Sequence, residues 1–490
     1  MHKVTIISNH QTKEVSVKSG ANLLDVLSKN GYLITADCGG HGTCMKCKVK
    51  CNHEYLLACQ TVVTQDIRVE LPNGESDGLL NSLKRSYEIK RKYGYGIAVD
   101  LGTTTIALYL MDLKNGWVID NISVLNAQTS YGTDVITRIK KCSEGHLDTL
   151  FSLIVKQINE IIHNFKLKHA INDIEEIVVA ANTTMLHILA HTDPTSLGTA
   201  PFTPVFLKRL EISGPIINLD AKRIVLLPAI SAYLGGDIVA GILACNIEEQ
   251  TKNIIFIDIG TNGEIIIKTK KGIYGTSTAA GPAFEGARIE WGTGGIPGAI
   301  SKVELADNEL RISTINNQKA MGICGSGLVD IVSLLVSEGL IDETGTFDYR
   351  SNSNLIENLY DGRFYITDKI YISQKDIREF QLAKSAIASG IQVLLEIAEL
   401  KAEDIDQIYL AGGFGFYINR NSAVNIGLLP KKTKEKIISV GNTSGLGAKM
   451  ALLNDDYRTQ CDEIATRVSV IELSNNPRFT EHFINNMLFE

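Results

Sequence analysis

The stretch that decides the fold reads Ile97-Ala98-Val99-Asp100-Leu101-Gly102-Thr103-Thr104. Its first half is a short apolar run, which predicts a buried strand, and its second half is a polar turn that contains a glycine. The same form returns in Phe256-Ile257-Asp258-Ile259-Gly260-Thr261-Asn262-Gly263. Because a recurring stretch indicates an internal repeat, the chain is predicted to contain a duplicated unit.

A second pair of segments supports the duplication. Residues 173–182 match residues 404–413, and each segment follows an apolar-periodic helix, predicted at residues 154–165 and 383–400. Each half therefore contains a strand, an acidic turn, a helix, a strand and a small-residue loop, in that order. This order predicts a duplicated α/β domain with a cleft between its two halves.

The composition excludes several classes of protein. The chain has 490 residues, which predicts two to four domains, and its hydrophobic fraction of 44% excludes a disordered chain. The net charge of −7 argues against nucleic acid as the main partner. No apolar run is long enough to span a bilayer, and the N-terminus lacks a secretory signal, so we expect a cytoplasmic protein without a membrane partner.

The first 72 residues predict a small mixed α/β domain. Short strands are expected at residues 4–7, 15–17 and 67–71, with an amphipathic helix from Leu23 that stops near Gly31. Residues 73–93 read as a linker with a strongly basic second half. That half is either a docking patch for an acidic partner or a solvated, partly helical connector.

A cysteine loop lies inside this small domain. Nine cysteines in a reducing compartment are not expected to form disulfides, and five of them fall within 22 residues. Three lie on one glycine-rich loop and a fourth follows separately, which suits a [2Fe–2S] cluster because soft thiolates match iron. A zinc site is the competing reading. The predicted ligands are Cys38, Cys44, Cys47 and Cys59, while Cys51 does not fit the spacing and is interpreted as structural.

The two Asp-x-Gly-Thr turns predict phosphate binding. The glycine lets the backbone turn close to an anion, and the N–H groups and threonine hydroxyls that follow can hold phosphate oxygens. Asp100 and Asp258 would organise Mg²⁺ through water, because Mg²⁺ keeps much of its hydration. A third glycine-rich turn, Ala411-Gly412-Gly413-Phe414-Gly415, follows a predicted strand near the C-terminus.

This set of turns resembles the superfamily of actin, the sugar kinases and the heat-shock chaperone ATPases. The resemblance implies that the first two turns clamp the phosphates of ATP and that the third lies against the adenosine. Carried onto this sequence, the first turn comprises Asp100, Gly102, Thr103, Thr104 and Thr105, the second Asp258, Gly260, Thr261 and Asn262, and the third Gly412, Gly413 and Phe414.

Further candidates surround these turns. Glu264 either orients the attacking water or is a solvated strand end. The segment from Gly281 to Arg288, which contains Glu285, stands where the superfamily often has a helix beside the adenine. Gly325 and Ser326 open another predicted helix, whose N–H groups could face a nucleotide. Both of these segments could instead be glycines needed only for packing.

A ferredoxin domain fused to an actin-like ATPase resembles the reductive activators of corrinoid proteins. Further motifs look like that family's, at residues 126–128, 131–139, 182–185 and 283–288. The resemblance implies a β-grasp [2Fe–2S] ferredoxin domain at 1–72, a linker at 73–93 and an actin-like ATPase with two subdomains at 94–490. The sequence departs from the family in one respect. Members of the family often have a further small domain between the ferredoxin and the ATPase, but only 40 residues separate Cys59 from Asp100 here. We therefore do not assume the dimer contacts that such a domain would make.

The family's function would be an ATP-dependent transfer of one electron from the cluster to the Co(II) of a corrinoid protein in a methyltransferase system. The implied partners are that corrinoid protein and a low-potential electron donor, and a homodimer is left open. One alternative is an activator of another low-potential reductase or radical dehydratase, although those activators lack a ferredoxin domain. Another is a nucleotide-binding regulator that senses an iron–sulfur cluster without turnover.

Overall fold

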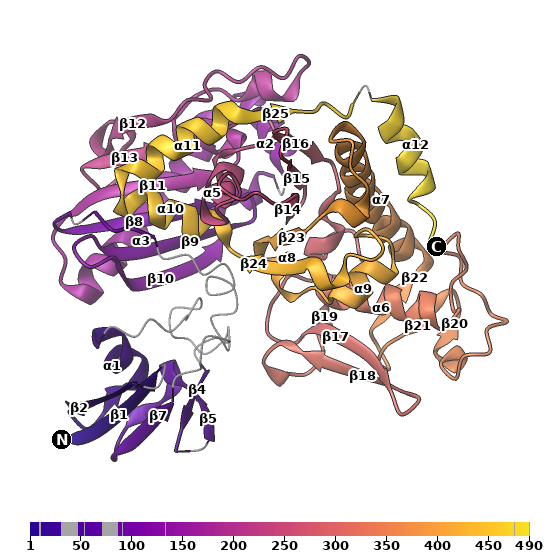
Figure 1. The fold of residues 1–490 in the computed structure, drawn as a ribbon, viewed down its shortest axis with the longest axis horizontal. Coiled ribbons are helices and arrows are strands. Elements are labelled where there is room, and N and C mark those ends of the chain that lie inside the picture. Colours follow the sequence, from indigo (N-terminus) through magenta and orange to yellow (C-terminus); the bar gives the residue numbers. More distant parts are fainter. Residues whose placement is uncertain are drawn as a thin grey trace. The chain divides into compact units, whose positions relative to one another are not determined.

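The computed structural model describes residues 1–490 except 9–10, 31–47, 53, 71–86, 91, 133, 475 and 490. The chain divides into two compact units, each described by itself below. One comprises residues 1–227 and 445–459, and the other comprises residues 228–444 and 460–490. Figure 1 labels the helices and strands.

The N-terminal residues form a five-stranded β-grasp sheet. Its strands run in the order β2-β1-β7-β4-β5, with β1 and β7 parallel and the other neighbours antiparallel. Helix α1 covers it through Leu23 and Leu27, which are fully buried with Val4 and Ile6 of the sheet. The strands are β1 (His2–Ser8), β2 (Gln11–Val17), β4 (Lys48–Cys51), β5 (Glu54–Leu57) and β7 (Ile67–Glu70), and α1 is Leu23–Lys29. This confirms the predicted fold of the small domain.

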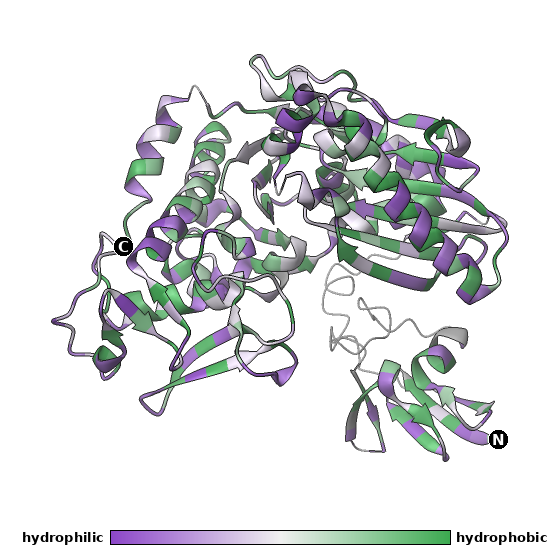
Figure 2. Ribbon diagram, turned by 180° about the vertical axis from the view of Figure 1, so that it is seen from behind, coloured by the Kyte–Doolittle hydropathy of each residue, from purple (hydrophilic) through white to green (hydrophobic). Residues whose placement is uncertain are grey.

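The first unit also contains a six-stranded sheet of order β10-β9-β8-β11-β13-β12. Strands β8, β9 and β10 form an antiparallel meander, and β11 and β13 continue from β8 in parallel. Hydrophobic residues, green in Figure 2, follow these strands because most of them are buried. The strands are β8 (Tyr95–Leu101), β9 (Thr105–Asp112), β10 (Trp117–Leu125), β11 (Ile174–Ala181), β12 (Leu210–Ser213) and β13 (Arg223–Leu226).

The second unit repeats this arrangement. Its sheet has the order β24-β23-β14-β15-β16-β25, with an antiparallel meander β14-β15-β16 and with β23 and β24 parallel to β14. The strands are β14 (Ile254–Ile259), β15 (Gly263–Lys268), β16 (Ile273–Thr278), β23 (Gln407–Ala411), β24 (Ile437–Gly441) and β25 (Val468–Val470). The shared order of five strands confirms the duplication read from the sequence.

Two long helices lie at the predicted positions. Helix α3 (Leu147–His169) contains the predicted segment 154–165, and α7 (Gln374–Ile397) starts nine residues before the predicted 383. The earlier start is explained by a capping box, in which the Ser373 and Asp376 side chains each accept from the other residue's backbone N–H. Helix α7 packs on β15 and β16, where Gly263 and Gly390 allow close approach.

Shorter elements complete the two units. The other helices are α2 (Val135–Lys141), α4 (Thr183–Leu189), α5 (Gly236–Ala244), α6 (Gly325–Ser337), α8 (Gly412–Tyr417), α9 (Arg420–Asn425), α10 (Thr443–Leu453), α11 (Asp455–Arg467) and α12 (Pro477–Asn485). Small sheets are formed by β3 (Ala21–Asn22) and β6 (Val62–Val63), by β17 (Ala299–Ala306), β18 (Glu309–Thr314) and β19 (Gly322–Ile323), and by β20 (Leu359–Tyr360), β21 (Arg363–Tyr365) and β22 (Tyr371–Ser373).

The described end of the predicted linker is attached to the first unit. The Lys90 ammonium bonds Asp456 at 2.7 Å, and the Lys92 ammonium bonds Asp455 at the same distance. The Glu88 backbone N–H also donates to the Tyr457 hydroxyl at 2.9 Å. These two lysines are therefore paired within the chain.

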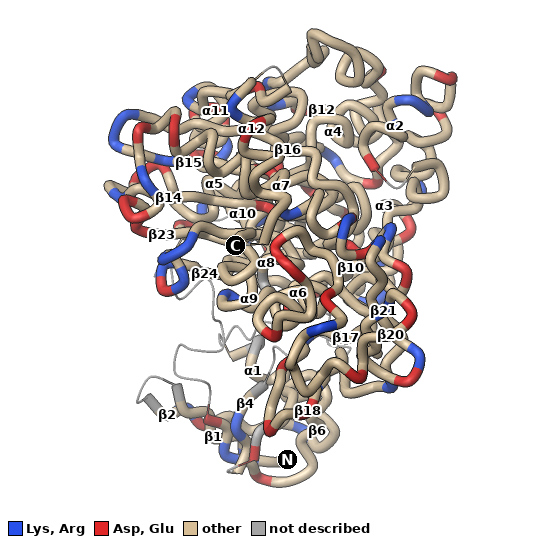
Figure 3. Tube along the Cα trace, turned by 90° about the vertical axis from the view of Figure 1, so that its right-hand side faces the viewer, with Lys and Arg blue, Asp and Glu red and all other residues tan. Residues whose placement is uncertain are grey.

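Charges of both signs are interspersed over the chain in Figure 3. The formal net charge of the 490 residues is −7. Within the part of the chain that the structure describes, no helix combines the length and apolar character of a membrane span.

Candidate functional site

Of the four predicted cluster ligands, Cys59 lies among the described residues. It occupies the short 3₁₀ helix η1 (Ala58–Gln60), is 6% exposed and belongs to the core of the β-grasp domain. The Asn22 amide donates to the Cys59 carbonyl at 2.8 Å, which fixes the backbone at this position. A thiol held rigidly and shielded from water suits a cluster ligand. The predicted ligands Cys38, Cys44 and Cys47 lie outside the described residues.

Cys51, the cysteine that does not fit the spacing, lies on β4. It is 4% exposed in the same core, and burial raises the pKa of its thiol to about 11. This agrees with the structural role expected for Cys51.

The first phosphate turn joins β8 to β9. Asp100 lies one residue before the end of β8, Gly102 to Thr104 form the turn, and Thr105 begins β9. The Gly102 N–H donates to the Thr105 carbonyl at 3.0 Å. A Cβ at position 102 would lie 2.6 Å from that carbonyl oxygen, so the turn requires glycine.

Two asparagines hold this turn. The Asn126 side chain, which is fully buried, donates to the Gly102 carbonyl at 2.9 Å, and its backbone N–H donates to the Thr104 carbonyl at 2.8 Å. The Asn182 amide donates to the Thr103 hydroxyl at 2.9 Å. Both residues belong to the family-like motifs seen in the sequence, where no role could be assigned to them.

The second phosphate turn joins β14 to β15 in the same way. The Gly260 N–H donates to the Asn262 carbonyl at 2.9 Å, and the Thr261 hydroxyl donates to a Glu285 carboxylate oxygen at 2.8 Å. Asp258 on β14 lies directly opposite Glu264 on β15 in the antiparallel register. Residues paired in this way place their side chains on the same face of the sheet. Glu264 therefore lies beside Asp258.

The surroundings of Glu264 disfavour its charged form. Burial, followed by the negative charges of Asp237 and Asp258, raises the pKa of its carboxyl well above the ordinary value, and a hydrogen bond from Asn262 opposes the shift. A carboxyl with a raised pKa suits proton transfer or the orientation of water near neutral pH. Glu264 is half-buried at this end of β15.

Sequence reasoning missed Asp237. It lies in the first turn of α5, directly after Gly235 and Gly236, and its charge reaches Glu264. The signal that could have found it is an acidic residue after two glycines at the start of an apolar helix. In the described part of the chain, no group of three or more His, Cys, Asp or Glu side chains could hold a metal ion.

The segment that contains Gly281 and Glu285 forms only a 3₁₀ turn, η6 (Pro282–Glu285), where a helix was expected from the superfamily. Gly281 has φ +76°, a left-handed conformation that favours glycine. Gly286 ends the turn, and a Cβ there would lie 2.4 Å from the Thr293 backbone nitrogen. Glu285 nevertheless reaches the second phosphate turn through Thr261.

Gly325 is the first residue of α6, as predicted, and its helix starts against an aromatic pair. A Cβ at Gly325 would lie 2.1 Å from the Phe284 carbonyl oxygen, so glycine is required for this packing. The rings of Phe284 and Phe414 stack with centroids 4.8 Å apart. The Ser326 hydroxyl donates to the Ser301 carbonyl at 2.9 Å.

Gly412 and Gly413 begin α8 after β23 but differ in their surroundings. Gly412 has φ +78°, and a Cβ there would lie 2.6 Å from the Asp258 carboxylate. A Cβ on Gly413 would meet no atom within 4 Å. The second turn, Glu264, Glu285 and Gly412 are thus connected within one unit, and Phe414 stacks on Phe284, the residue before Glu285.

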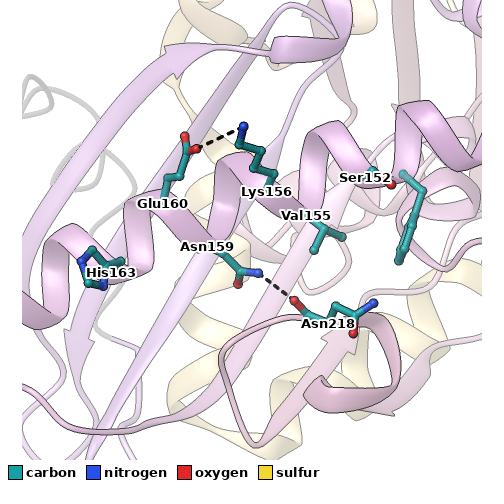
Figure 4. A pocket seen from close by; sticks show the side chains of 8 residues that line it. Ser152, Val155, Lys156, Asn159, Glu160, His163 and Asn218 are labelled. Atoms are coloured by element: carbon teal, nitrogen blue, oxygen red, sulfur yellow. Dashed lines mark hydrogen bonds and ion pairs between the residues drawn. The ribbon is translucent and has the colours of Figure 1, made fainter.

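A surface groove in the first unit contains none of the predicted site residues. It runs along α3, as Figure 4 shows, and Val155 and His163 are among its lining residues. The Asn159 amide donates across it to the Asn218 carbonyl at 2.7 Å. The groove has no convergent set of catalytic groups, so it carries no functional assignment.

Comparison with known proteins supports a common origin over nearly the whole chain. Three family models match: the 2Fe-2S iron-sulfur cluster binding domain at residues 6–64, the RACo middle region at 95–250 and the C-terminal domain of RACo, the ASKHA domain, at 252–490. The chain is 34% identical over 423 residues to the corrinoid activation enzyme RamQ of Eubacterium limosum, covering 82% of this chain and 71% of that protein.

A second relative and a solved structure agree. The chain is 24% identical over 417 residues to the [Co(II) methylated amine-specific corrinoid protein] reductase of Methanosarcina barkeri, covering 77% of this chain and 74% of the relative. It is similar to the solved structure of a reductive activator for corrinoid, iron-sulfur protein, with a TM-score of 0.75 and 26% identity. That match covers 100% of this chain and 98% of the other.

Proposed function

This chain belongs to the family of reductive activators of corrinoid proteins, and from that premise we propose that it couples ATP hydrolysis to electron transfer. In the proposed reaction, one electron passes to the Co(II) of a corrinoid protein and regenerates Co(I) for methyl transfer. The partners are that corrinoid protein and a low-potential electron donor. Residues 1–72 are the electron-carrying domain, and residues 94–490 are the ATPase.

One observation carries this proposal: a single chain matches both a 2Fe-2S cluster binding domain and an ASKHA domain. A donor whose electron runs downhill needs no ATPase, and an ATPase without a redox task needs no ferredoxin domain. The pairing therefore favours an uphill electron transfer that is driven by ATP.

The energy involved is within the reach of one nucleotide. A plant-type [2Fe–2S] ferredoxin has a reduction potential of about −400 mV. For a one-electron couple each ~59 mV is a factor of ten, so a gap of ~200 mV costs roughly 4 to 5 kcal/mol. Hydrolysis of ATP can supply this if it changes the environment of the donor or of the corrinoid.

In the small domain, the cluster supplies one-electron transfer at low potential when it is bound. The chain's own contribution is to hold four thiolates in place, at Cys38, Cys44, Cys47 and Cys59. Cys59 illustrates how, since its backbone is fixed by the Asn22 amide and its side chain is shielded in the domain core. Shielding from water also tunes the potential of such a site.

In the ATPase, the two turns share the binding of the phosphates. Thr103, Thr104 and Thr105 of the first turn bind phosphate oxygens through hydroxyl and N–H groups. In the second turn Gly260 lets the backbone turn, and the N–H groups of Thr261 and Asn262 bind phosphate oxygens. Asp100 and Asp258 hold the water shell of Mg²⁺. Glu264, when ionised, orients the water that attacks the terminal phosphate.

The test is reciprocal stimulation. The protein is mixed anaerobically with a Co(II) corrinoid protein, a reductant and Mg-ATP, and the rate of ATP hydrolysis is compared with that of the protein alone. We expect the corrinoid protein to raise the rate in wild type and to have no effect in Asp258→Asn, the matched inactive control. If no Co(II) corrinoid protein, including those encoded nearby in its genome, stimulates hydrolysis, one of the two alternatives becomes the better hypothesis. These are an activator of a radical dehydratase and a nucleotide-binding regulator that senses an iron–sulfur cluster.

A further inference from the structure

A buried arginine contacts the first phosphate turn and has no part in the function described so far. Arg138 lies on α2, within one of the family-like motifs, and is fully buried. One of its terminal nitrogens, Nη2, donates to the Thr103 carbonyl. Together with the bonds from Asn126 to Gly102 and Thr104, this contact leaves each of the three consecutive carbonyls of the turn with a donor.

The other donors of Arg138 are also used by neutral groups. Its Nε donates to the Gly132 carbonyl at 3.0 Å, and its Nη1 donates to the Gln128 side-chain oxygen at 3.0 Å and contacts the Met185 sulfur at 3.1 Å. Among the described residues, no carboxylate lies within ion-pair distance, 4.0 Å, of Arg138. The hydrogen bonds are thus satisfied, but the positive charge lacks a direct counter-charge.

Arg138 remains charged despite its burial. Burial lowers the pKa of its guanidinium to about 10, while the negative charge of Asp134 acts in the opposite direction. At neutral pH the side chain is therefore a cation. By contrast Arg458, which is 2% exposed in the same unit, is paired directly with the carboxylate of Glu176.

The contact with Thr103 has a geometric consequence. Because the peptide unit is planar and trans, its C=O and N–H groups point in opposite directions. When Arg138 and Asn126 fix the carbonyls of the turn on one side, they fix the following N–H groups on the other. The direction of the N–H groups is what an anion-binding turn must control.

We infer that Arg138 is a positioning residue for nucleotide phosphates, which aims the first turn and supplies a buried positive charge whose counter-charge arrives with the ligand. The inference rests on the proposed binding of ATP and goes beyond it, because it assigns recognition of the phosphate charge to a residue outside both Asp-x-Gly-Thr turns. A buried cation without a carboxylate is costly, and a bound polyphosphate offsets that cost. The ligand class is a nucleoside di- or triphosphate rather than a nucleoside.

The test separates charge from scaffolding. Dissociation constants for ATP, ADP and adenosine are measured by competition with a fluorescent ATP analogue in wild type, Arg138→Gln and Arg138→Lys. Arg138→Gln should weaken ATP by about tenfold while adenosine changes little, as expected for one charge acting over ~10 Å at an effective dielectric near 20. Arg138→Lys keeps the charge and should restore the preference for ATP over adenosine to within about threefold of wild type.

Arg458→Lys is the matched control, because it changes an equally buried arginine that a carboxylate already neutralises. It should alter thermal stability without changing the ratio of the ATP and adenosine constants. Equal weakening of ATP and adenosine in Arg138→Gln would reduce Arg138 to a scaffold and overturn the inference. If Arg138→Gln does not fold, the test is Arg138→Lys: if this variant no longer prefers ATP over adenosine, the inference is overturned. Failure of wild type to bind ATP would refute the proposed function, and the inference with it.

Discussion

The glycine pair at the start of α8 offers a sharp test, because two neighbouring positions should fail in different ways. At Gly412 an alanine must adopt φ +78° and place its methyl 2.6 Å from the Asp258 carboxylate. The left-handed conformation costs about 1–2 kcal/mol for a residue with a Cβ. The carboxylate must also move by roughly 0.8 Å to restore the ordinary contact distance of 3.4 Å.

Gly413→Ala meets no such obstacle. No atom lies within 4 Å of the added methyl, and alanine is favoured over glycine in a helix by up to about 1 kcal/mol. If Gly413 lies against the adenosine, the methyl instead occupies ligand space and costs about 1.4 kcal/mol of binding, a factor of ten. We therefore predict that Gly413→Ala weakens ATP binding about tenfold, while the thermal stability of the protein is unchanged or higher.

Thermal unfolding and ATP titration of both variants measure the two effects. At about 2–4 °C per kcal/mol for a unit of this size, Gly412→Ala should lower Tm by roughly 2–8 °C. It should also weaken ATP binding, because the displaced carboxylate belongs to the second phosphate turn. Wild-type ATP affinity in Gly413→Ala would refute the contact with adenosine. An unchanged Tm in Gly412→Ala would refute the strain argument.

The other predictions concern the cluster and the carboxylates. Cys59→Ser should lose the [2Fe–2S] absorbance and about two iron and two sulfide per chain, whereas Cys51→Ser should keep them. A protein that contains only zinc, or loss of the cluster in Cys51→Ser, would contradict the predicted ligands. Asp258→Asn should keep the cluster's absorbance and reduction but lose Mg-ATP hydrolysis, because charge that forms in the transition state is no longer balanced. Full hydrolytic activity of this variant would remove the second turn from the mechanism. Asp237→Asn removes a negative charge that raises the pKa of Glu264, so the acidic limb of the hydrolysis profile should move to lower pH; an unmoved limb would separate Glu264 from catalysis.

Much of the fold could be predicted because its signals are local. The apolar runs that end in Asp-x-Gly-Thr determine β8 and β14, and their recurrence reveals the duplication seen in the two sheets. The early start of α7 was missed because its signal is a capping box at Ser373 and Asp376, outside the apolar period used to place the helix. Length and periodicity determine that a helix exists better than they determine its ends.

Only those residues of the candidate site that lie in or next to a recognisable sequence motif could be predicted. Asp258 and Glu264 are close in sequence, so alternation along a hairpin was enough to bring them together. Asp237 could not be found in this way, since its effect on Glu264 depends on how α5 packs against the sheet. Arg138 was equally hidden, because a charged residue on a short helix is expected at the surface and only the fold buries it.

The central claim is that ATP drives the electron to the corrinoid. The most direct measurement follows the Co(I) absorbance of a Co(II) corrinoid protein mixed anaerobically with this protein and a reductant that reduces its cluster, before and after addition of Mg-ATP. We expect most cobalt to stay Co(II) until Mg-ATP is added and then to become Co(I), and we expect no change with Asp258→Asn. Complete reduction without nucleotide, or no reduction with it, would contradict an electron transfer driven by ATP.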